Sequence, residues 1–168
     1  MGAISNMEKV AVLTEALPYM QKFFGKTVVI KYGGNAMINA ELKQKVVQDI
    51  IFMKYAGMRP VVVHGGGPEI TAALKQMGKQ SSFVSGLRVT DVETMAVAEM
   101  VLVGKINTEI VNILNRSGVK AVGLNGKDAN LTVAKKHLAQ VHENGQLKEV
   151  DIGYVGDVER INPDILVT

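Results

Sequence analysis

Residues 60–70 read PVVVHGGGPEI, an apolar run followed by three consecutive glycines and a proline. The run at 61–63 predicts a buried strand, and Pro68 suits the first turn of a following helix. Glycines between a strand and a helix let backbone N–H groups approach an anion at the positive helix end. The segment His64 to Gly67 therefore predicts an anion-binding loop. The alternative, a tight turn that needs the glycines only for its backbone angles, stays open.

A similar segment lies upstream, where residues 27–34 read TVVIKYGG. Lys31 stands at the end of a predicted strand, and Gly33 and Gly34 follow it. Ligands of open α/β sheets bind at the carboxyl ends of the strands, and a lysine there can neutralise charge on a transferring phosphoryl group. Alone, this lysine would be interpreted as a solvated side chain beside a flexible turn. Two glycine loops at neighbouring strand ends favour the ligand interpretation.

Working outward, strands and helices alternate. The uninterrupted apolar runs at 27–30 and 61–63 predict strands covered on both faces. Helical spacing predicts a crossover helix that ends near Gly57 and a helix after Pro68, with the core positions Leu42, Val46, Ile50, Met53, Ile70, Leu74 and Met77. Thr90 and Glu93 form a capping-box pattern that opens helical stretches toward Gly104 and Gly118. The fold class is α/β, with a mostly parallel open sheet flanked by helices.

The last third of the chain departs from this pattern. A strand is predicted at 121–124, and the dipeptides at 125–126 and 144–145 are both Asn-Gly, a hairpin-type turn. They flank apolar segments at 131–133 and 138–141, which together predict a small antiparallel excursion. Residues 162–166 read NPDIL and predict the start of a helix.

The N-terminal segment forms a separate element. Ser5 and Glu8 predict a capping box for a helix within residues 1–25, kinked at Pro18, with residues 26–168 as the domain. An apolar stripe follows helical spacing through Val10, Leu13, Leu17, Met20 and Phe24. Either the stripe binds a partner, which would make the helix an oligomerisation element, or it folds back on its own domain.

Composition excludes several classes of protein. Of 168 residues, 47% are hydrophobic and 21% charged, which is typical of a globular protein. No cysteine is present, so disulfides, thiolate zinc sites and cysteine nucleophiles are excluded. A formal charge of +3 from scattered basic residues, with no tryptophan, does not favour nucleic-acid binding. No apolar run reaches the length of a membrane span and no secretory signal is visible, so we expect a cytoplasmic protein.

Several catalytic signatures are missing. The chain contains no G-x-x-x-x-G-K-[ST] and no G-x-G-x-x-G, which disfavours Walker-type and Rossmann dinucleotide sites. An HGGG string also occurs in esterases, but the G-x-S-x-G elbow that this function needs is absent. The histidines His64, His137 and His142 show no metal-ligand spacing, so no metal site is predicted. Arg88, in GLRVT, could bind a carboxylate through its guanidinium, although a lone arginine is more often a surface residue.

Four longer motifs occur together: KYGGNAM at 31–37, VVVHGGGPEI at 61–70, GLRVTDVETM at 86–95 and GYVGDVERINP at 153–163. In this order they resemble the amino-acid kinase family. They are most similar to members that transfer the γ-phosphoryl group of ATP to the side-chain carboxylate of N-acetyl-L-glutamate, in arginine biosynthesis. The resemblance implies a three-layer α/β fold, and ATP with Mg²⁺ as a substrate, the metal being coordinated mostly through the nucleotide.

The resemblance also implies roles for seven residues. Lys31 is the catalytic lysine that stabilises the transition state. The remaining positions contact phosphate or substrate: Gly33, Gly34 and Gly65 in the phosphate loops, and Gly66, Gly67 and Arg88 at the acetylglutamate. Ala129 stands where the family usually has a glycine.

The resemblance covers only the family's substrate-binding half. The nucleotide-binding half, which follows it in the family, has no counterpart in these residues, so we expect the chain to be inactive or nearly so alone. The N-terminal helix resembles that of arginine-inhibited members, which implies a homo-oligomer, a dimer or a hexamer built from dimers. It also implies arginine as an effector, and photosynthetic relatives add a PII-type protein. Two alternatives stay open: a non-catalytic acetylglutamate-binding or assembly module, and another acyl-phosphate or carbamate kinase of the family.

Overall fold

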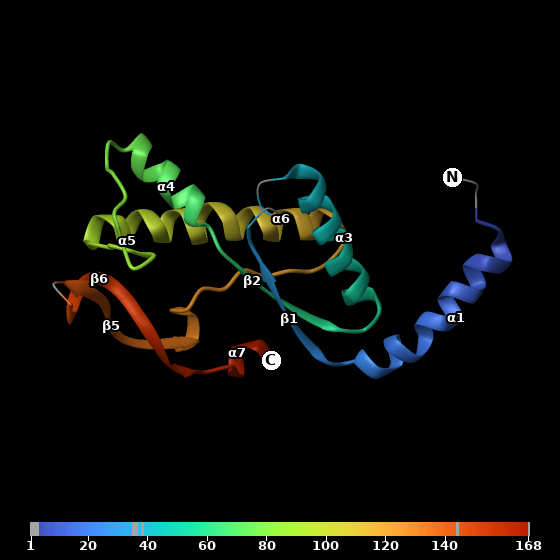
Figure 1. The fold of residues 1–168 in the computed structure, drawn as a ribbon. Helices are drawn as coiled ribbons and strands as arrows, with labels where there is room; N and C mark the ends of the chain where they lie inside the picture. Colours follow the sequence, from blue (N-terminus) through green and yellow to red (C-terminus); the bar gives the residue numbers. More distant parts are fainter. Residues whose placement is uncertain (1–3, 35–36, 38, 144, 168) are drawn as a thin grey trace. The chain divides into compact units, whose positions relative to one another are not determined.

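The computed structural model describes residues 4–34, 37, 39–143 and 145–167 (Figure 1). Its contacts divide the chain into two compact units, residues 1–65 with 113–120 and residues 66–112 with 121–168. The first unit holds helix α1 (Asn6–Phe23), strand β1 (Thr27–Tyr32), helix α3 (Ala40–Tyr55), strand β2 (Arg59–His64) and the end of α6 (Thr108–Arg116). The second holds α4 (Gly67–Gln76), β3 (Phe83–Val84), β4 (Leu87–Arg88), α5 (Val92–Glu99), the π-helix η1 (Met100–Asn107), the start of α6, the 3₁₀ turn η2 (Asp128–Asn130), β5 (Thr132–Glu143), β6 (Gln146–Ile161) and α7 (Asp164–Val167).

Helix α1 begins at the predicted capping box. The Glu8 N–H donates to Ser5 Oγ at 3.2 Å, and the Ser5 N–H donates to Glu8 Oε2 at 2.8 Å. These bonds satisfy two N–H groups that a helix N-terminus otherwise leaves unpaired. The helix continues through Pro18 to Phe23, and none of its described side chains is buried.

Strands β1 and β2 pair in parallel over six residues each, from Thr27 opposite Arg59 to Tyr32 opposite His64 (Figure 1). Because side chains alternate along a strand, Ile30 and Tyr32 lie on one face of β1, whereas Val29 and Lys31 lie on the other. The first face is covered and Tyr32 is buried, but Val29 is 68% exposed. The prediction that β1 is covered on both faces is therefore wrong within this unit, because the packing covers only alternate positions of this strand, whereas the adjacent Val61 and Val62 of β2 are both half-buried.

Helix α3 connects these strands, as the sequence predicts. Asn39 caps it by accepting hydrogen bonds from the Glu41 and Leu42 N–H groups at 2.9 and 3.0 Å. Its buried residue is Ile50, and Val46 and Met53 are half-buried. Leu42, expected on the same core face, is 39% exposed, so this prediction is wrong at the first turn of the helix. After the helix, the Gly57 carbonyl accepts from the Gly25 N–H at 2.8 Å, and a Cβ at Gly57 would lie 2.3 Å from a ring carbon of Phe24. Glycine at this position lets the ends of α1 and α3 approach each other.

In the second unit, α4 starts with Pro68 in its first turn, as predicted, and buries Ile70 and Leu74. Met77 was expected on the same face, but it is 61% exposed because α4 ends at Gln76 and the chain turns there. Elements α5, η1 and α6 then follow without a break and end before Gly118, as the helical spacing predicts. The apolar core of the unit continues through Val97, Val101, Ile106, Ala139 and Ile152.

The N-cap of α5 is Asp91, not Thr90. Asp91 Oδ1 accepts from the Thr94 N–H at 2.8 Å. Thr90 is buried and forms a parallel bridge with Gly153, so its backbone and hydroxyl are already engaged. The predicted capping box therefore begins one residue too early.

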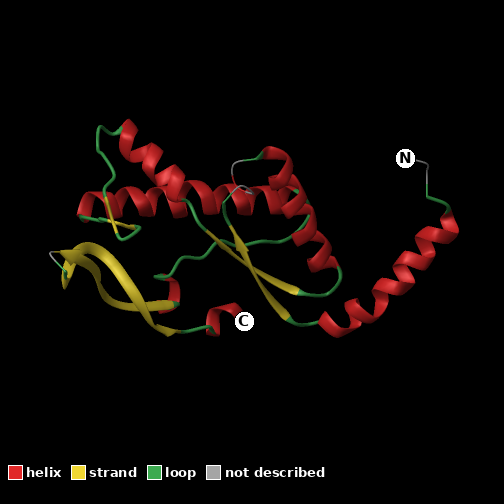
Figure 2. Ribbon diagram, in the orientation of Figure 1, coloured by secondary structure: helices red, strands yellow, loops and turns green. Residues whose placement is uncertain are grey.

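The predicted antiparallel excursion is the long hairpin of β5 and β6, coloured as strands in Figure 2. Its turn contains Gly145, as predicted; Asn144 lies outside the described residues. Two predictions nearby are wrong. Residues 121–124 form no strand, because the Leu124 carbonyl accepts from the Asn107 side chain at 3.1 Å and Val122 is exposed. Asn125 opens no hairpin either, since its side chain and N–H bond to Lys127 and Asp128 ahead of η2.

The fold class is α/β, with a parallel strand pair, flanking helices and a preceding N-terminal helix. The predicted C-terminal helix is present as α7. The sequence analysis did not predict strands β3 and β4, which form a short antiparallel pair that places Phe83 opposite Arg88. Among the described residues, no helix has the length and apolarity needed to span a membrane.

Replacing the buried leucine of α4 should destabilise the protein. Leu74 is 1% exposed, so Leu74→Ala should lower the free energy of unfolding by about 2–5 kcal/mol through lost burial and the cavity that remains. Met77→Ala at the exposed end of the same helix is the control and should change it by less than about 0.5 kcal/mol. Urea unfolding followed by circular dichroism measures both. Equal losses would contradict the assignment of Leu74, and not Met77, to the core.

Candidate functional site

The carboxyl ends of β1 and β2 bring the predicted phosphate-loop residues together. Lys31 is opposite Val63 in the parallel register, and both strands end one residue later. Gly33 and Gly34 follow β1, and Gly65 follows β2, with its N–H donating to the Tyr32 carbonyl at 3.1 Å. The two glycine segments are therefore neighbours at one edge of the strand pair, as the sequence predicts. A Cβ on any of these three glycines would meet no atom within 4 Å.

Lys31 lies on the exposed face of β1, so its ammonium group is accessible to solvent. His64, the last residue of β2, has Nδ1 3.0 Å from the Gly65 carbonyl oxygen. The tautomer that carries a proton on Nδ1 would donate it to this carbonyl, which gives His64 a role in the loop conformation. The other histidines lie on the β5–β6 hairpin, where His137 Nδ1 is 3.0 Å from both carboxylate oxygens of Asp157.

In the second unit, Gly66 and Gly67 form the N-terminus of α4. Gly66 is buried, and a Cβ there would lie 2.5 Å from Ile106 Cδ1 and 2.7 Å from Leu102 Cδ2. Glycine at this position lets η1 pack against the start of α4. Gly67 is exposed, and a Cβ on it would meet nothing within 4 Å. The N-terminus of α4 is therefore packed against η1 at Gly66 and open to solvent at Gly67.

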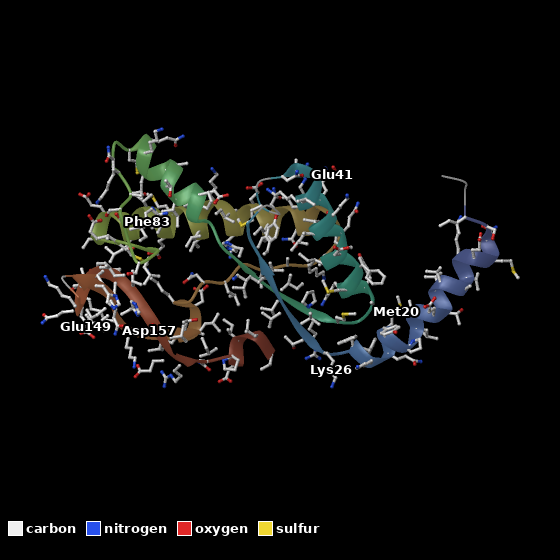
Figure 3. The ribbon with its side chains drawn as sticks, in the orientation of Figure 1. Met20, Lys26, Glu41, Phe83, Glu149 and Asp157 are labelled. Atoms are coloured by element: carbon white, nitrogen blue, oxygen red, sulfur yellow. The ribbon has the colours of Figure 1, made fainter. Side chains whose placement is uncertain are left out.

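Arg88 lies against this helix start. Its Nη2 donates to the Gly67 carbonyl at 3.0 Å and to Thr71 Oγ1 at 2.8 Å, and its Nη1 donates to Ser81 Oγ. The guanidinium carbon lies 4.8 Å from the centre of the Phe83 ring, which is labelled in Figure 3. Hydrogen bonds in the guanidinium plane and an aromatic ring over its face fix both its position and its tilt.

The guanidinium keeps binding capacity in this arrangement. It has five N–H donors, of which three bond to Gly67, Thr71 and Ser81. Within the described ranges the other two, on Nε and Nη1, have no hydrogen-bond partner. Because the positive end of the α4 dipole lies beside this charged group, the site favours a carboxylate or phosphate.

The sequence did not indicate the residues that hold Arg88. Thr71 donates its own proton to the Gly67 carbonyl at 3.0 Å while accepting from Arg88. Its spacing from Gly67 is one helical turn, which alone carries no functional signal. Ser81 and Phe83 precede Arg88 in a segment without periodicity, so only the β3–β4 pairing brings Phe83 to it.

An ion pair secures the segment on both sides of Arg88. Lys79 Nζ lies 2.6 and 2.8 Å from the two Asp91 carboxylate oxygens and 2.8 Å from Glu93 Oε2. The hydrogen bonds that Lys79 donates, first to Asp91 and then to Glu93, raise the pKa of Lys79. The hydrogen bond from Lys79 and those from Thr94 lower the pKa of Asp91 to about 2.

Metal binding has no support from the described side chains, which contain no cluster of three or more His, Asp or Glu residues able to hold an ion.

Residues 26–167 match the model of the amino acid kinase family. The chain belongs to this family. Acetylglutamate kinase from Moorella thermoacetica is 58% identical over 165 residues, which cover 98% of this chain and 56% of that protein. Acetylglutamate kinase from Desulfitobacterium hafniense is 58% identical over 97% of this chain and 55% of its own length. The chain thus spans about half the length of the curated relatives it matches.

Solved structures have the same fold. N-acetylglutamate synthase from Neisseria gonorrhoeae, complexed with coenzyme A and N-acetyl-glutamate, superposes with a TM-score of 0.70 at 24% identity. The match covers 94% of this chain and 34% of the synthase chain. The protein smu.665 from Streptococcus mutans UA159 gives a TM-score of 0.67 at 26% identity, over 84% of this chain and 53% of its own. The fold of this amino acid kinase family member is therefore shared beyond its close relatives.

The Lys79–Asp91 pair should make stability depend on acid pH. The pKa of Asp91 is below its ordinary value of 3.8, so its contribution is complete above about pH 4 and is lost as the pH falls through about 2. Lys79 has a raised pKa, so its contribution is complete below 10.5 and is lost only at higher pH. Asp91→Asn, which keeps an N-cap acceptor, should lower Tm by a constant amount from about pH 5 to 9, and this difference should shrink toward pH 2.

Differential scanning calorimetry across this pH range measures the effect. Asp49→Asn, an exposed carboxylate on α3, is the control and should leave Tm unchanged. A difference between Asp91→Asn and the unmodified chain that persists undiminished at pH 2 would contradict the role of the ion pair.

Proposed function

We propose that this chain is the substrate-binding half of an acetylglutamate kinase, which transfers the γ-phosphoryl group of ATP to the side-chain carboxylate of N-acetyl-L-glutamate. The observation that carries the proposal is the identity of 58% to proteins named acetylglutamate kinase along nearly the whole chain. The arrangement of Arg88 at the N-terminus of α4 supports it, because that site has the charge and the donors to bind a dicarboxylate.

In this proposal Arg88 binds the α-carboxylate of acetylglutamate. A guanidinium already fixed by Gly67, Thr71, Ser81 and Phe83 loses little further side-chain entropy when the substrate binds. The exposed backbone at Gly67 gives the ligand access to the helix end. The site therefore binds and orients the acceptor.

In the proposed reaction Lys31 stabilises the phosphoryl group during its transfer. A side-chain carboxylate oxygen of the substrate attacks the γ-phosphorus, the bond from that phosphorus to the β,γ-bridging oxygen breaks, and ADP leaves with the electron pair of that bond. The product is an acyl phosphate. Negative charge on the transferring group is stabilised by the ammonium of Lys31 and by backbone N–H groups at Gly33 and Gly34. Gly65 shapes the adjoining loop, because its own N–H already donates to the Tyr32 carbonyl.

In this scheme no side chain of the chain is assigned as a magnesium ligand. The described side chains offer no cluster for it, so we assign it no step and expect it to arrive bound to ATP. The nucleotide would be held by residues outside this chain, consistent with its span of about half of the relatives. Alone, the chain should bind acetylglutamate without forming ADP.

Helix α1 is proposed to join copies of the protein. Its apolar residues Leu13 and Leu17 are 62% and 49% exposed, and Met20, labelled in Figure 3, lies on the same element. Apolar surface of this kind is stabilised by covering it, which a second copy of the helix would do. Leu13→Asp should then lower the mass measured by light scattering after size exclusion, whereas Glu15→Ala should leave it unchanged.

Calorimetric titration of the chain with N-acetyl-L-glutamate tests substrate binding. We expect saturable binding that Arg88→Ala weakens by about tenfold or more, since an ionised donor group is lost, and no binding of ATP with Mg²⁺. Circular dichroism checks that both proteins are folded. Aspartate and carbamate are titrated in parallel, and tighter binding of either would favour another kinase of the family.

A chimera tests catalysis. In it, this chain replaces the matching residues of the Moorella thermoacetica acetylglutamate kinase. Lys31→Ala should lower kcat by about 10² or more with little change in acetylglutamate binding, because the lysine acts on charge that develops in the transition state. Lys26→Ala, at the residue immediately before the same strand, is the matched control. An unchanged kcat for Lys31→Ala would remove Lys31 from the mechanism.

A further inference from the structure

The segment that carries Arg88 is joined to the β5–β6 hairpin by a short parallel bridge. The Thr90 N–H donates to the Ile152 carbonyl at 2.8 Å, and the Tyr154 N–H donates to the Thr90 carbonyl at 2.7 Å. Gly153 lies between the two hydrogen-bonded residues of β6. Thr90 is 6% exposed and Ile152 is fully buried, so water does not compete for these bonds.

Only glycine allows this approach. Gly153 has φ of +82°, a conformation that side chains rarely adopt. A Cβ there would lie 2.0 Å from the Thr90 carbonyl oxygen and 2.7 Å from its carbonyl carbon. Both are backbone atoms of the bridge, so they cannot rotate away as a flexible side chain would. Any larger residue at Gly153 must push β6 from Thr90.

The bridge continues to Arg88 through a side chain. The Thr90 hydroxyl donates to the Arg88 carbonyl at 2.9 Å. On the other side of Arg88, Ser85 Oγ donates to the Gln140 carbonyl of β5 at 2.8 Å. The Arg88 segment is thus bound to β6 after the arginine and to β5 before it, and these bonds are separate from those that hold its guanidinium.

We infer that Thr90 and Gly153 are positioning residues, which fix the backbone of Arg88 so that its guanidinium meets the carboxylate of the acceptor. The inference rests on the proposed function, because it assigns them to the acceptor site of that reaction. Neither residue touches substrate in this scheme. A shift of about 1 Å in a binding group can reduce the rate by up to about 10².

The first test compares two glycines of one hairpin. Gly153→Ala introduces the collision with Thr90, whereas Gly145→Ala, at φ of +78° in the hairpin turn, introduces a Cβ that meets nothing within 4 Å. Both variants place alanine at a similar unfavourable φ, so the difference between their effects isolates the collision. In the chimera, Gly153→Ala should raise KM for acetylglutamate by about tenfold and leave KM for ATP unchanged, while Gly145→Ala should change neither.

A second readout needs no activity and uses the 168-residue chain itself. The Phe83 ring lies 4.8 Å from the Arg88 guanidinium carbon, so its ring current should shift the arginine side-chain NMR signals. Phe83→Leu identifies these signals by abolishing the shift. Gly153→Ala should move them toward their values in unfolded chains and speed hydrogen exchange at the Thr90 and Tyr154 amides, and Gly145→Ala should do neither.

Two substitutions at Thr90 test the inference with less risk of unfolding the protein than Gly153→Ala. Thr90→Val removes the hydroxyl that bonds to the Arg88 carbonyl but keeps the side-chain shape and the backbone bridge. It should raise KM for acetylglutamate severalfold, and Thr90→Ser, which restores the hydroxyl, should recover the unmodified value. Thr108→Val, whose hydroxyl bonds to the Val103 carbonyl, is the control for loss of a threonine hydroxyl elsewhere in the unit.

The outcomes separate the two proposals. If the unmodified chimera forms no acyl phosphate from acetylglutamate, the proposed function fails, and with it the assignment of these residues to that site. If the chimera is active but Gly153→Ala and Thr90→Val leave KM and the Arg88 signals unchanged, the inference alone is overturned. Equal effects of Gly153→Ala and Gly145→Ala would also overturn it, because backbone strain would then explain the result.

Discussion

The parallel pairing of β1 with β2 is the constraint that brings together the residues at the ends of these strands: Lys31, Gly33, Gly34 and Gly65. Six residues of each strand are in register, so both strands end at the same edge and Gly65 bonds directly to Tyr32. Parallel strands need a crossover, and α3 provides it. The other face keeps Val29 exposed, and Lys31 shares this face. The apolar run that makes β1 a strand therefore also determines where the lysine is presented.

The placement of Arg88 depends on a different principle. A long arginine side chain on a two-residue strand would sample many rotamers, which weakens any specific carboxylate contact. Here acceptors from α4 and the preceding segment engage three donors, and Phe83 covers the guanidinium face. The backbone beneath it is bonded through Ser85 and Thr90 to the hairpin. Because the two sets of bonds are independent, side-chain orientation and backbone position can be perturbed separately.

Much of this fold can be predicted from local sequence. The capping box at Ser5, the crossover helix α3, Pro68 at the start of α4 and the turn at Gly145 each depend on neighbours within a few residues. The errors occur where distant residues decide. Thr90 has the sequence of an N-cap, but its bridge to Gly153 makes Asp91 the cap instead. The strand expected at 121–124 fails because the Leu124 carbonyl bonds to a side chain from η1. The sequence motifs predicted a role for Arg88. Thr71, Ser81 and Phe83, which contact its guanidinium, had no signal in the sequence, because only the folded chain brings them to Arg88.

The glycines of the site separate into two kinds by what surrounds them. At Gly66 and Gly153 the protein itself fills the space that a Cβ would need, with η1 side chains in one case and the Thr90 carbonyl in the other. The fold requires those glycines. At Gly33, Gly65 and Gly67 a Cβ would meet nothing, and the backbone there avoids the left-handed region, so packing and turn geometry place no demand on the residue. What Gly33 and Gly67 offer is a backbone that a group from outside the chain can approach closely, whereas the N–H of Gly65 already donates to the Tyr32 carbonyl. The approach of an anion would give a physical reason for glycine at Gly33 in the first unit and, separately, at Gly67 in the second, which is what the proposed phosphoryl transfer requires of these loops.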